Sequence, residues 1–109
     1  MTRRHSVGPN SEFQRIMRHP PLSSRLLLVF ALPNDRSGFR LGVAVSSRLK
    51  GAVRRNRAKR RLREAARLTL QPFLGDYDVI LLARQALESG SWQALEAELT
   101  RVRELIGRR

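Results

Sequence analysis

The chain has 109 residues, which is enough for one domain with a two-layer core but not for two separate cores. Its 22 Lys and Arg residues against nine acids give a formal net charge of +13, and repulsion of this size favours a polyanionic partner. The absence of Cys excludes a disulfide framework and a thiolate zinc site. The longest apolar run, residues 26–32, is too short to span a bilayer and no secretory signal is visible, so a cytoplasmic protein is expected.

Arginine makes up 20 of the 22 basic residues. Guanidinium groups bind phosphate in a bidentate manner and stack on bases, which favours RNA or DNA as the partner. A GC-rich genome would also raise the number of Arg residues, so composition alone does not identify the partner.

The predicted elements begin after a polar segment, residues 1–10, which we expect to form a flexible N-terminal arm. Ser11 opens the sequence Ser-Glu-Phe-Gln, a capping-box pattern that predicts the start of a helix. The helix should end near Arg18, because Pro20 and Pro21 follow and disfavour helical backbone before them.

Two strands are predicted next. Residues 25–32 and 39–45 are rich in Leu, Val and Phe, and residues 33–38 between them have turn chemistry. The pair is therefore predicted to form an antiparallel hairpin. Gly42 lies inside the second strand and predicts either a bulge or a close approach of another group to the backbone.

Residues 52–70 predict a long helix with two different faces. Seven of the ten residues from 54 to 63 are Lys or Arg. One acid, Glu64, stands among ten bases from Arg48 to Arg67, so no ion-pair network is expected to neutralise this charge. At about 100° per residue, small apolar side chains share one stripe and polar side chains share the opposite one. The expected buried stripe is Ala58, Leu62, Ala65 and Thr69, and the expected exposed stripe is Asn56, Arg60, Arg63 and Arg67, flanked by Arg57 and Lys59.

Two more elements are predicted after Pro72 and Gly75, which end the long helix. Residues 78–83 contain a run of Val, Ile and Leu between turn signals and predict a strand that is covered on both faces or paired at the centre of the sheet. Ser91 is the expected cap of a final helix that reaches Gly107. The order of elements indicates a single two-layer α+β domain over residues 11–107.

The cationic face of residues 52–70 predicts binding to a polyanion, most simply a nucleic acid. A membrane-surface helix is disfavoured, because interfacial helices carry Trp, Phe and Leu where this one has Ala and Thr. A structural ribosomal protein and a DNA-binding module with this helix in the major groove are both open alternatives. A solvated run of charge is the remaining, purely structural interpretation.

Catalysis by the protein itself is not predicted. His5 and His19 have no partner at a useful spacing. Asp76 and Asp78 would share a strand face and could in principle hold one Mg²⁺. They lack a third carboxylate for a two-metal site, so we interpret them as turn acids that open a strand.

Residues 51–64, Gly-Ala-Val-Arg-Arg-Asn-Arg-Ala-Lys-Arg-Arg-Leu-Arg-Glu, resemble the RNR signature of the bacterial ribonuclease P protein subunit. That signature is Arg-Asn-Arg followed by Lys-Arg and Arg-Glu at fixed spacing, and it is far more specific than a generic basic run. Three further segments agree in order and spacing, so the similarity spans roughly residues 11–105. They are Glu12-Phe13-Gln14, Arg40-Leu41-Gly42-Val43 with Val45-Ser46, and Asp78-Val79-Ile80 with Ala83-Arg84.

The resemblance implies an accessory protein subunit of an endoribonuclease in which the RNA subunit is the catalyst and uses Mg²⁺. The holoenzyme removes the 5′ leader from precursor tRNA, and the protein binds both the catalytic RNA and the leader, with one protein expected per RNA. The implied fold is α+β, with a mostly antiparallel sheet of three to four strands and helices on one side. Its order is helix, two or three strands, helix, strand, helix, with a left-handed βαβ crossover around the RNR helix.

The resemblance also implies two groups of RNA-contacting residues, and it assigns no metal-contacting residue. Phe13 and Phe30 would offer ring faces for base stacking, although both are also candidates for the core. Met17 stands where many members have a second Phe, and Gln85 replaces a common Lys. Asn56 both donates and accepts hydrogen bonds, which suits a base edge, a 2′-OH or a metal-bound water. The implied RNA-binding residues are Arg54, Arg55, Asn56, Arg57, Lys59, Arg60, Arg61, Arg63 and Arg67, and the implied leader-cleft residues are Phe13, Met17, Leu28 and Phe30.

Overall fold

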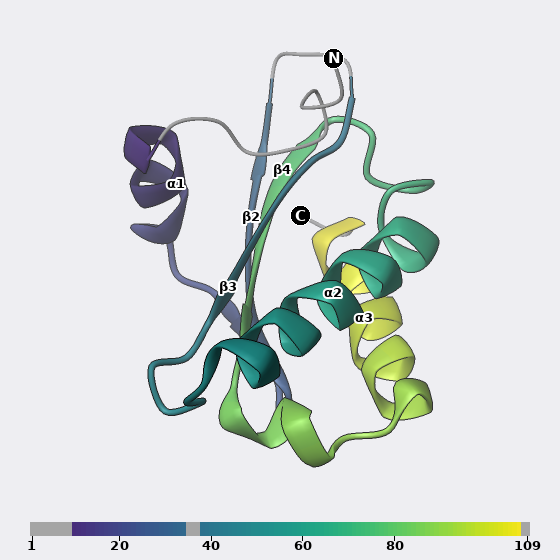
Figure 1. Cartoon of the computed structure of the whole chain (residues 1–109). Helices are drawn as coiled ribbons and strands as arrows, with labels where there is room; N and C mark the ends of the chain where they lie inside the picture. Colours follow the sequence, from purple (N-terminus) through teal and green to yellow (C-terminus); the bar gives the residue numbers. More distant parts are fainter. Residues whose placement is uncertain (1–9, 35–37, 108–109) are drawn as a thin grey trace.

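A computed structural model describes residues 10–34 and 38–107 of the chain (Figure 1). The predicted N-terminal arm therefore lies, apart from Asn10, outside the described residues. The predicted helices and strands are present, each within about two residues of its expected bounds, and two short elements were not predicted. The described elements are α1 (Asn10–Met17), β1 (Leu22–Ser23), β2 (Leu27–Pro33), β3 (Arg40–Val45), α2 (Ala52–Thr69), β4 (Tyr77–Ala83), the 3-10 helix η2 (Gln85–Ser89) and α3 (Trp92–Gly107).

The sheet of the described residues has four strands in the order β1-β2-β4-β3. β1 pairs with β2 and β2 pairs with β4, both antiparallel, whereas β3 pairs with β4 in parallel. The prediction of a β2–β3 hairpin is wrong, because β4 lies between these two strands. The six residues between Pro33 and Arg40 are enough to span the distance from β2 to β3, since two strand spacings are about 10 Å. Asn34 N–H donates to the carbonyl of Asp76 and Gly38 N–H donates to the carbonyl of Gly75, which fastens this connection to the segment before β4.

β3, α2 and β4 form a βαβ unit. In Figure 1, β3 lies in front of β4, both strands run toward the bottom of the view, and α2 lies to their right. This arrangement makes the connection left-handed, as the resemblance implied. General packing rules favour the right-handed form, so the residue pattern alone would have predicted the opposite hand.

The two faces of the sheet are covered by different helices (Figure 1). Successive strand residues point to opposite faces, so β2 contributes Leu27, Val29 and Ala31 to the main core with α2 and α3. The alternate residues Leu28 and Phe30 join a second cluster beneath α1. The expectation that all helices lie on one side is therefore wrong for α1. Because β2 and β4 are apolar on both faces, both faces need a cover.

The helix ends test the capping predictions. Ser91 Oγ accepts a hydrogen bond from Ala94 N–H at 3.0 Å, as expected for the cap of α3. Ser11 is not a cap, because α1 already begins at Asn10, and capping patterns locate a helix start only to within one or two residues. None of the helices within residues 10–34 and 38–107 combines the length and apolar character needed to cross a membrane.

Candidate RNA-binding surface

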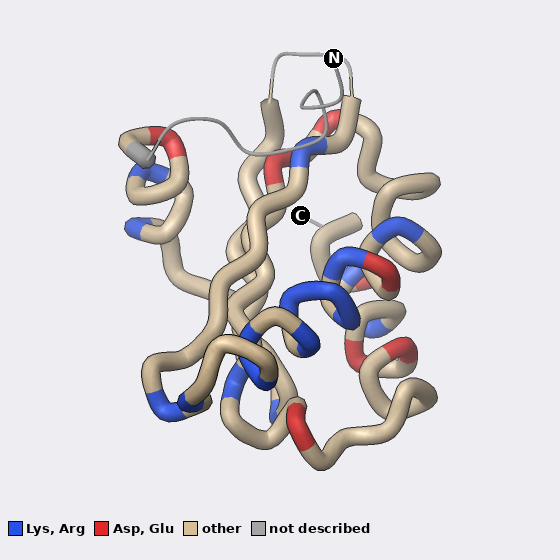
Figure 2. The backbone as a smooth tube through the Cα atoms, in the orientation of Figure 1, with Lys and Arg blue, Asp and Glu red and all other residues tan. Residues whose placement is uncertain are grey.

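The predicted division of α2 into two faces is confirmed. The buried residues of the helix are Ala58, Leu62, Ala65, Ala66 and Thr69, and they pack in the main core. Figure 2 shows Lys and Arg concentrated along α2. The exposed stripe lines a shallow depression of about 460 Å³, and small buried residues hold the helix close to the sheet beneath it. The lining residues are Asn56, Lys59, Arg60, Arg63, Glu64 and Arg67.

Two of the α2 cations form separate salt bridges, which do not join into a network and leave most of the positive charge of the helix unneutralised. Arg54 forms a two-pronged pair with Glu88 of η2, and Arg67 pairs with Glu64 at 2.7 Å. Each guanidinium lowers the pKa of its carboxylate partner, chiefly through the hydrogen bond. Glu88 is distant in sequence, so the local charge pattern could not reveal it. All four side chains are solvent-exposed, and such pairs exchange readily for phosphate contacts.

Two further predicted RNA contacts are engaged with the protein backbone. Arg55 donates to the carbonyls of Ser46 and Leu49 at 3.2 and 2.9 Å and thereby fixes the loop between β3 and α2. Arg61 donates to the carbonyls of Leu87 and Gly90 at 2.8 and 2.7 Å and thereby fixes η2 against α2. Both side chains are half-buried. Their geometry therefore assigns them a structural task beside any contact with RNA.

The remaining predicted cations are available to a ligand. Arg57, Arg60 and Arg63 are exposed, Lys59 is half-buried, and none of the four forms a hydrogen bond or salt bridge with another described residue. Asn56 is exposed on the same face. The free positive charge of α2 is thus concentrated on the stripe that faces solvent.

The predicted leader-cleft residues lie together between α1 and the sheet. Phe30 is only 5% exposed and forms a small core with Ile16 and Ile80, so its main role is packing. Phe13 and Met17 are half-buried at the edge of this cluster. A Cβ at residue 42 would lie 2.7 Å from Phe13 Cε2, which confirms the predicted close approach at Gly42. The small residue lets the aromatic ring rest directly on the backbone of β3.

A second depression, of about 700 Å³, includes the predicted cleft residue Leu28. Its apolar part is the register pair Leu28 and Leu82, and three guanidinium groups surround it. Arg84 donates to the carbonyl of Ser24 at 3.1 Å, which fixes one of these groups. Most of these residues were not predicted, because they come from separate segments that only the sheet topology brings together. The lining residues are Arg25, Leu28, Ser46, Arg48, Leu82, Arg84, Gln85 and Ala86.

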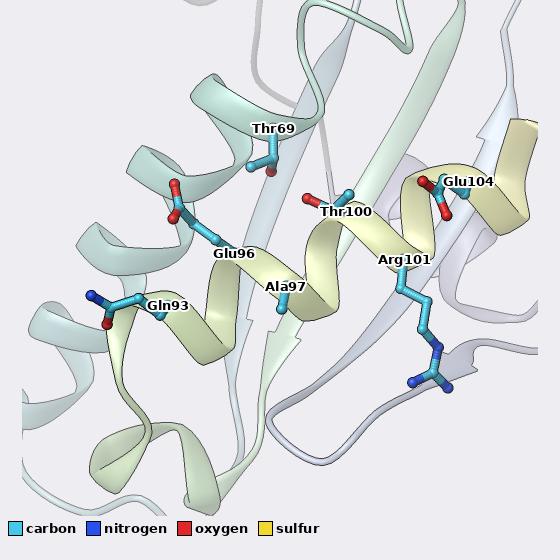
Figure 3. Close-up of a pocket in the computed structure, with 7 residues that line it drawn as sticks. All are labelled: Thr69, Gln93, Glu96, Ala97, Thr100, Arg101 and Glu104. Atoms are coloured by element: carbon cyan, nitrogen blue, oxygen red, sulfur yellow. The ribbon is translucent and has the colours of Figure 1, made fainter.

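The outer face of α3 has a different character (Figure 3). A depression of about 620 Å³ there is lined by residues of α3 and by Thr69. Glu96 and Glu104 contribute carboxylates, and Arg101 extends away from the other labelled side chains. The mixture of charges contrasts with the cationic stripe of α2, so the surface of the protein is electrostatically uneven.

The strand acid Asp78 has a structural partner. Its carboxylate is 2% exposed and accepts two hydrogen bonds from Arg40, at 2.9 and 2.7 Å. Asn34 Nδ2 donates to the same carboxylate at 2.7 Å. In the part of the chain that the structure describes, no three His, Asp or Glu side chains are grouped to hold a metal ion. Asp76 lies in the turn before β4 and Asp78 is the second residue of the strand, in agreement with the interpretation that these acids open a strand, and the contacts of Asp78 are structural.

Comparisons with known proteins give a consistent result. The sequence model of the family Ribonuclease P matches residues 1–106. The ribonuclease P protein component of Streptococcus agalactiae is 33% identical over 108 residues, which cover 98% of each chain. The same component of an Exiguobacterium species is 37% identical over 86 residues, which cover 78% of this chain and 75% of the relative. The structure of the Staphylococcus aureus RNase P protein has a TM-score of 0.79 at 30% identity and covers 94% of each chain.

These matches extend over nearly the whole chain and include the α2 motif that lines the cationic stripe. The similarity of the fold agrees with the similarity of the sequences, since the S. aureus protein matches in both. The chain therefore belongs to the ribonuclease P protein family.

Proposed function

We propose that the exposed stripe of α2 docks the RNA subunit of ribonuclease P. As a protein component of this ribonucleoprotein, the chain serves tRNA 5′ processing, in which the RNA carries out catalysis. The observation that supports the docking surface is the pair of exposed cations Arg60 and Arg63, which form no hydrogen bond or salt bridge with another described residue. Neutralising backbone phosphates with such groups releases counterions and gives sequence-independent affinity.

The proposed site for the 5′ leader of precursor tRNA, which we call the leader groove, consists of Phe13 on α1 and the basic depression beside Leu28 and Leu82. A single strand is held by backbone neutralisation together with stacking on a planar side chain, which tolerates many sequences. Phe13 supplies a half-exposed ring, and the depression beyond it supplies the guanidinium groups of Arg25 and Arg48. We assign Phe30 to the floor of this groove because it is buried.

Mg²⁺ is assigned to the RNA subunit in this proposal. The carboxylate of Asp78 is committed to Arg40 and Asn34, so it is unsuited to a metal ion. We further propose one protein per RNA and a cytoplasmic location, in keeping with a partner that acts on precursor tRNA.

Reconstitution at low Mg²⁺ tests the proposed function as a whole. Addition of the protein to the catalytic RNA should increase the rate of precursor-tRNA cleavage, because its cations replace part of the charge screening that Mg²⁺ provides. The measurement is the cleavage rate with and without protein over a series of Mg²⁺ concentrations. A rate that does not respond to the protein, combined with stable sedimentation with ribosomes, would instead support a structural rRNA-binding protein.

Replacing Phe13 by Ala tests the leader groove. Loss of a stacked base costs about 1–3 kcal/mol, so we expect precursors with long leaders to bind roughly 5- to 100-fold more weakly. Mature tRNA, which has no leader, should be affected much less. The measurement is the affinity of the holoenzyme for the two RNAs.

Phe13→Leu is the matched control, because Leu preserves apolar packing against Gly42 but has no ring face. A leader-specific loss in both variants supports stacking. If Phe13→Leu binds the leader normally, or if both RNAs lose affinity equally, the role of Phe13 is packing alone.

A further inference from the structure

A branched polar cluster joins α1 to the sheet on the side of the proposed leader groove. Arg40 of β3 donates through Nε and Nη2 to the carboxylate of Asp78 in β4. The remaining terminal nitrogen, Nη1, donates to Glu12 Oε1 of α1 at 3.1 Å. One guanidinium group thus connects three elements that are far apart in the sequence.

The cluster is well shielded from solvent. The side chains of Arg40 and Glu12 are 11% and 23% exposed, and Asp78 is nearly fully buried. The hydrogen bond from Arg40 to Asp78 is the largest cause of a raised pKa at Arg40, and Glu12 adds to it. Only a planar fork with separate donors can hold two carboxylates in fixed directions, so Lys could not replace Arg40 in both contacts.

The attachment of α1 is otherwise modest. The helix has eight residues, and isolated helices of this length are marginal in water. Its apolar contacts with the sheet come from Phe13, Ile16 and Met17, of which Ile16 is fully buried. The Glu12–Arg40 bond therefore adds a polar attachment to this small apolar contact.

We propose that the Glu12–Arg40 bond sets the docked position of α1 and thereby the affinity of the groove for the leader. Glu12 and Arg40 are positioning residues in this view, since they hold the helix that carries Phe13 and need not touch RNA. If only a fraction of molecules has α1 docked, the apparent affinity for the leader falls in proportion to that fraction. The inference rests on the leader groove proposed above.

Glu12→Gln is the principal test, because it leaves the Arg40–Asp78 pair intact and so preserves the fold. We expect the KM of the reconstituted holoenzyme for a long-leader precursor to rise about three- to tenfold, with kcat unchanged. Affinity for mature tRNA and for the catalytic RNA should stay the same. Amide hydrogen exchange of α1 in the full-length protein should become faster, while exchange in β4 should not change.

A double-mutant cycle gives the second measurement. Arg40→Lys keeps a cation beside Asp78 but loses one branch of the fork, so it should also raise the KM. Combined with Glu12→Gln, it should add little, because both changes weaken the same contact: Gln keeps an acceptor oxygen but loses the negative charge that pairs with Arg40. The matched control is Gln14→Ala, an exposed residue of the same helix, which should leave the KM near the wild-type value.

The outcomes separate this inference from the proposed function. Unchanged α1 exchange, or equal losses for leader-bearing and mature tRNA, would overturn the positioning role of Glu12. If Phe13→Ala is leader-specific while Glu12→Gln has no effect, the groove stands and only the positioning role fails. If neither variant has a leader-specific effect, the leader groove itself is wrong.

Discussion

Replacing Arg60 and Arg63 together by Ala is expected to weaken binding of the catalytic RNA roughly 10- to 100-fold at low salt. Both side chains are exposed on the α2 stripe and have no partner among the described residues, so their charge is free for phosphate. Loss of two phosphate contacts should also flatten the log–log dependence of affinity on salt by about 1.4–1.8. The measurement is the dissociation constant over a series of salt concentrations.

Arg101→Ala is the matched control for this charge removal. Arg101 is also exposed, but it lies on α3 and not on the α2 stripe, and the same face of α3 carries Glu96 and Glu104. We expect its removal to leave the salt slope nearly unchanged. An unchanged slope in the Arg60/Arg63 variant, or an equal change in the Arg101 variant, would show that the α2 stripe is not a specific docking surface.

Replacing Asp78 by Ala is expected to lower the free energy of unfolding by about 3 kcal/mol. The carboxylate is nearly fully buried, and its loss would leave the shielded Arg40 with only the bond to Glu12 and would remove an acceptor from Asn34. Such a change is a large fraction of the stability of a typical domain. The measurement is urea unfolding of the full-length protein.

Asp76→Ala provides the comparison, because Asp76 is an exposed acid two residues away. Its side-chain removal should change stability by less than about 0.5 kcal/mol. A similar small effect at Asp78 would mean that the Arg40 fork adds no net stability.

The sequence predicted the individual elements well because their signals are local. The small buried stripe and the cationic stripe of α2 depend only on helical periodicity, so Ala58 and Leu62 lie inside and Arg60 lies outside as expected. The cap of α3 at Ser91 and the buried strand before it also follow from nearby residues. Gly42 predicted that another group lies close to the backbone of its strand. That group, the ring of Phe13, could be identified only in the folded chain.

The arrangement of the elements could not be predicted in the same way. Turn residues between two strands fit a tight hairpin and a connection across a third strand equally well, and the continuous apolar run of β4 suits the central place. The position of α1, on the sheet face opposite to α2 and α3, could be predicted only by knowing which residues β2 presents on each face. The left hand of the crossover followed from the family resemblance, since general rules favour the right hand.

Only the part of the candidate site that lies within one local segment, α2, could be predicted. The α2 residues form one contiguous motif, and four of them lie on one exposed stripe of the helix, namely Asn56, Arg60, Arg63 and Arg67. The basic depression beside Leu28 draws Arg25, Arg48 and Arg84 from three separate segments, so no spacing in the sequence marks it. The hydrogen bonds of Arg55 and Arg61 to backbone carbonyls could not be predicted either, because every residue supplies such an acceptor and the sequence does not show which ones lie nearby.

The central place of β4 has a consequence for biosynthesis. A nascent chain that ends before residue 77 contains β2 and β3 but lacks the strand that separates and bonds them. The sheet therefore cannot close until β4 has left the ribosome, and the cationic α2 segment emerges before the layer beneath it is complete. Folding of this domain during translation thus has to wait for contacts between residues that are distant along the chain.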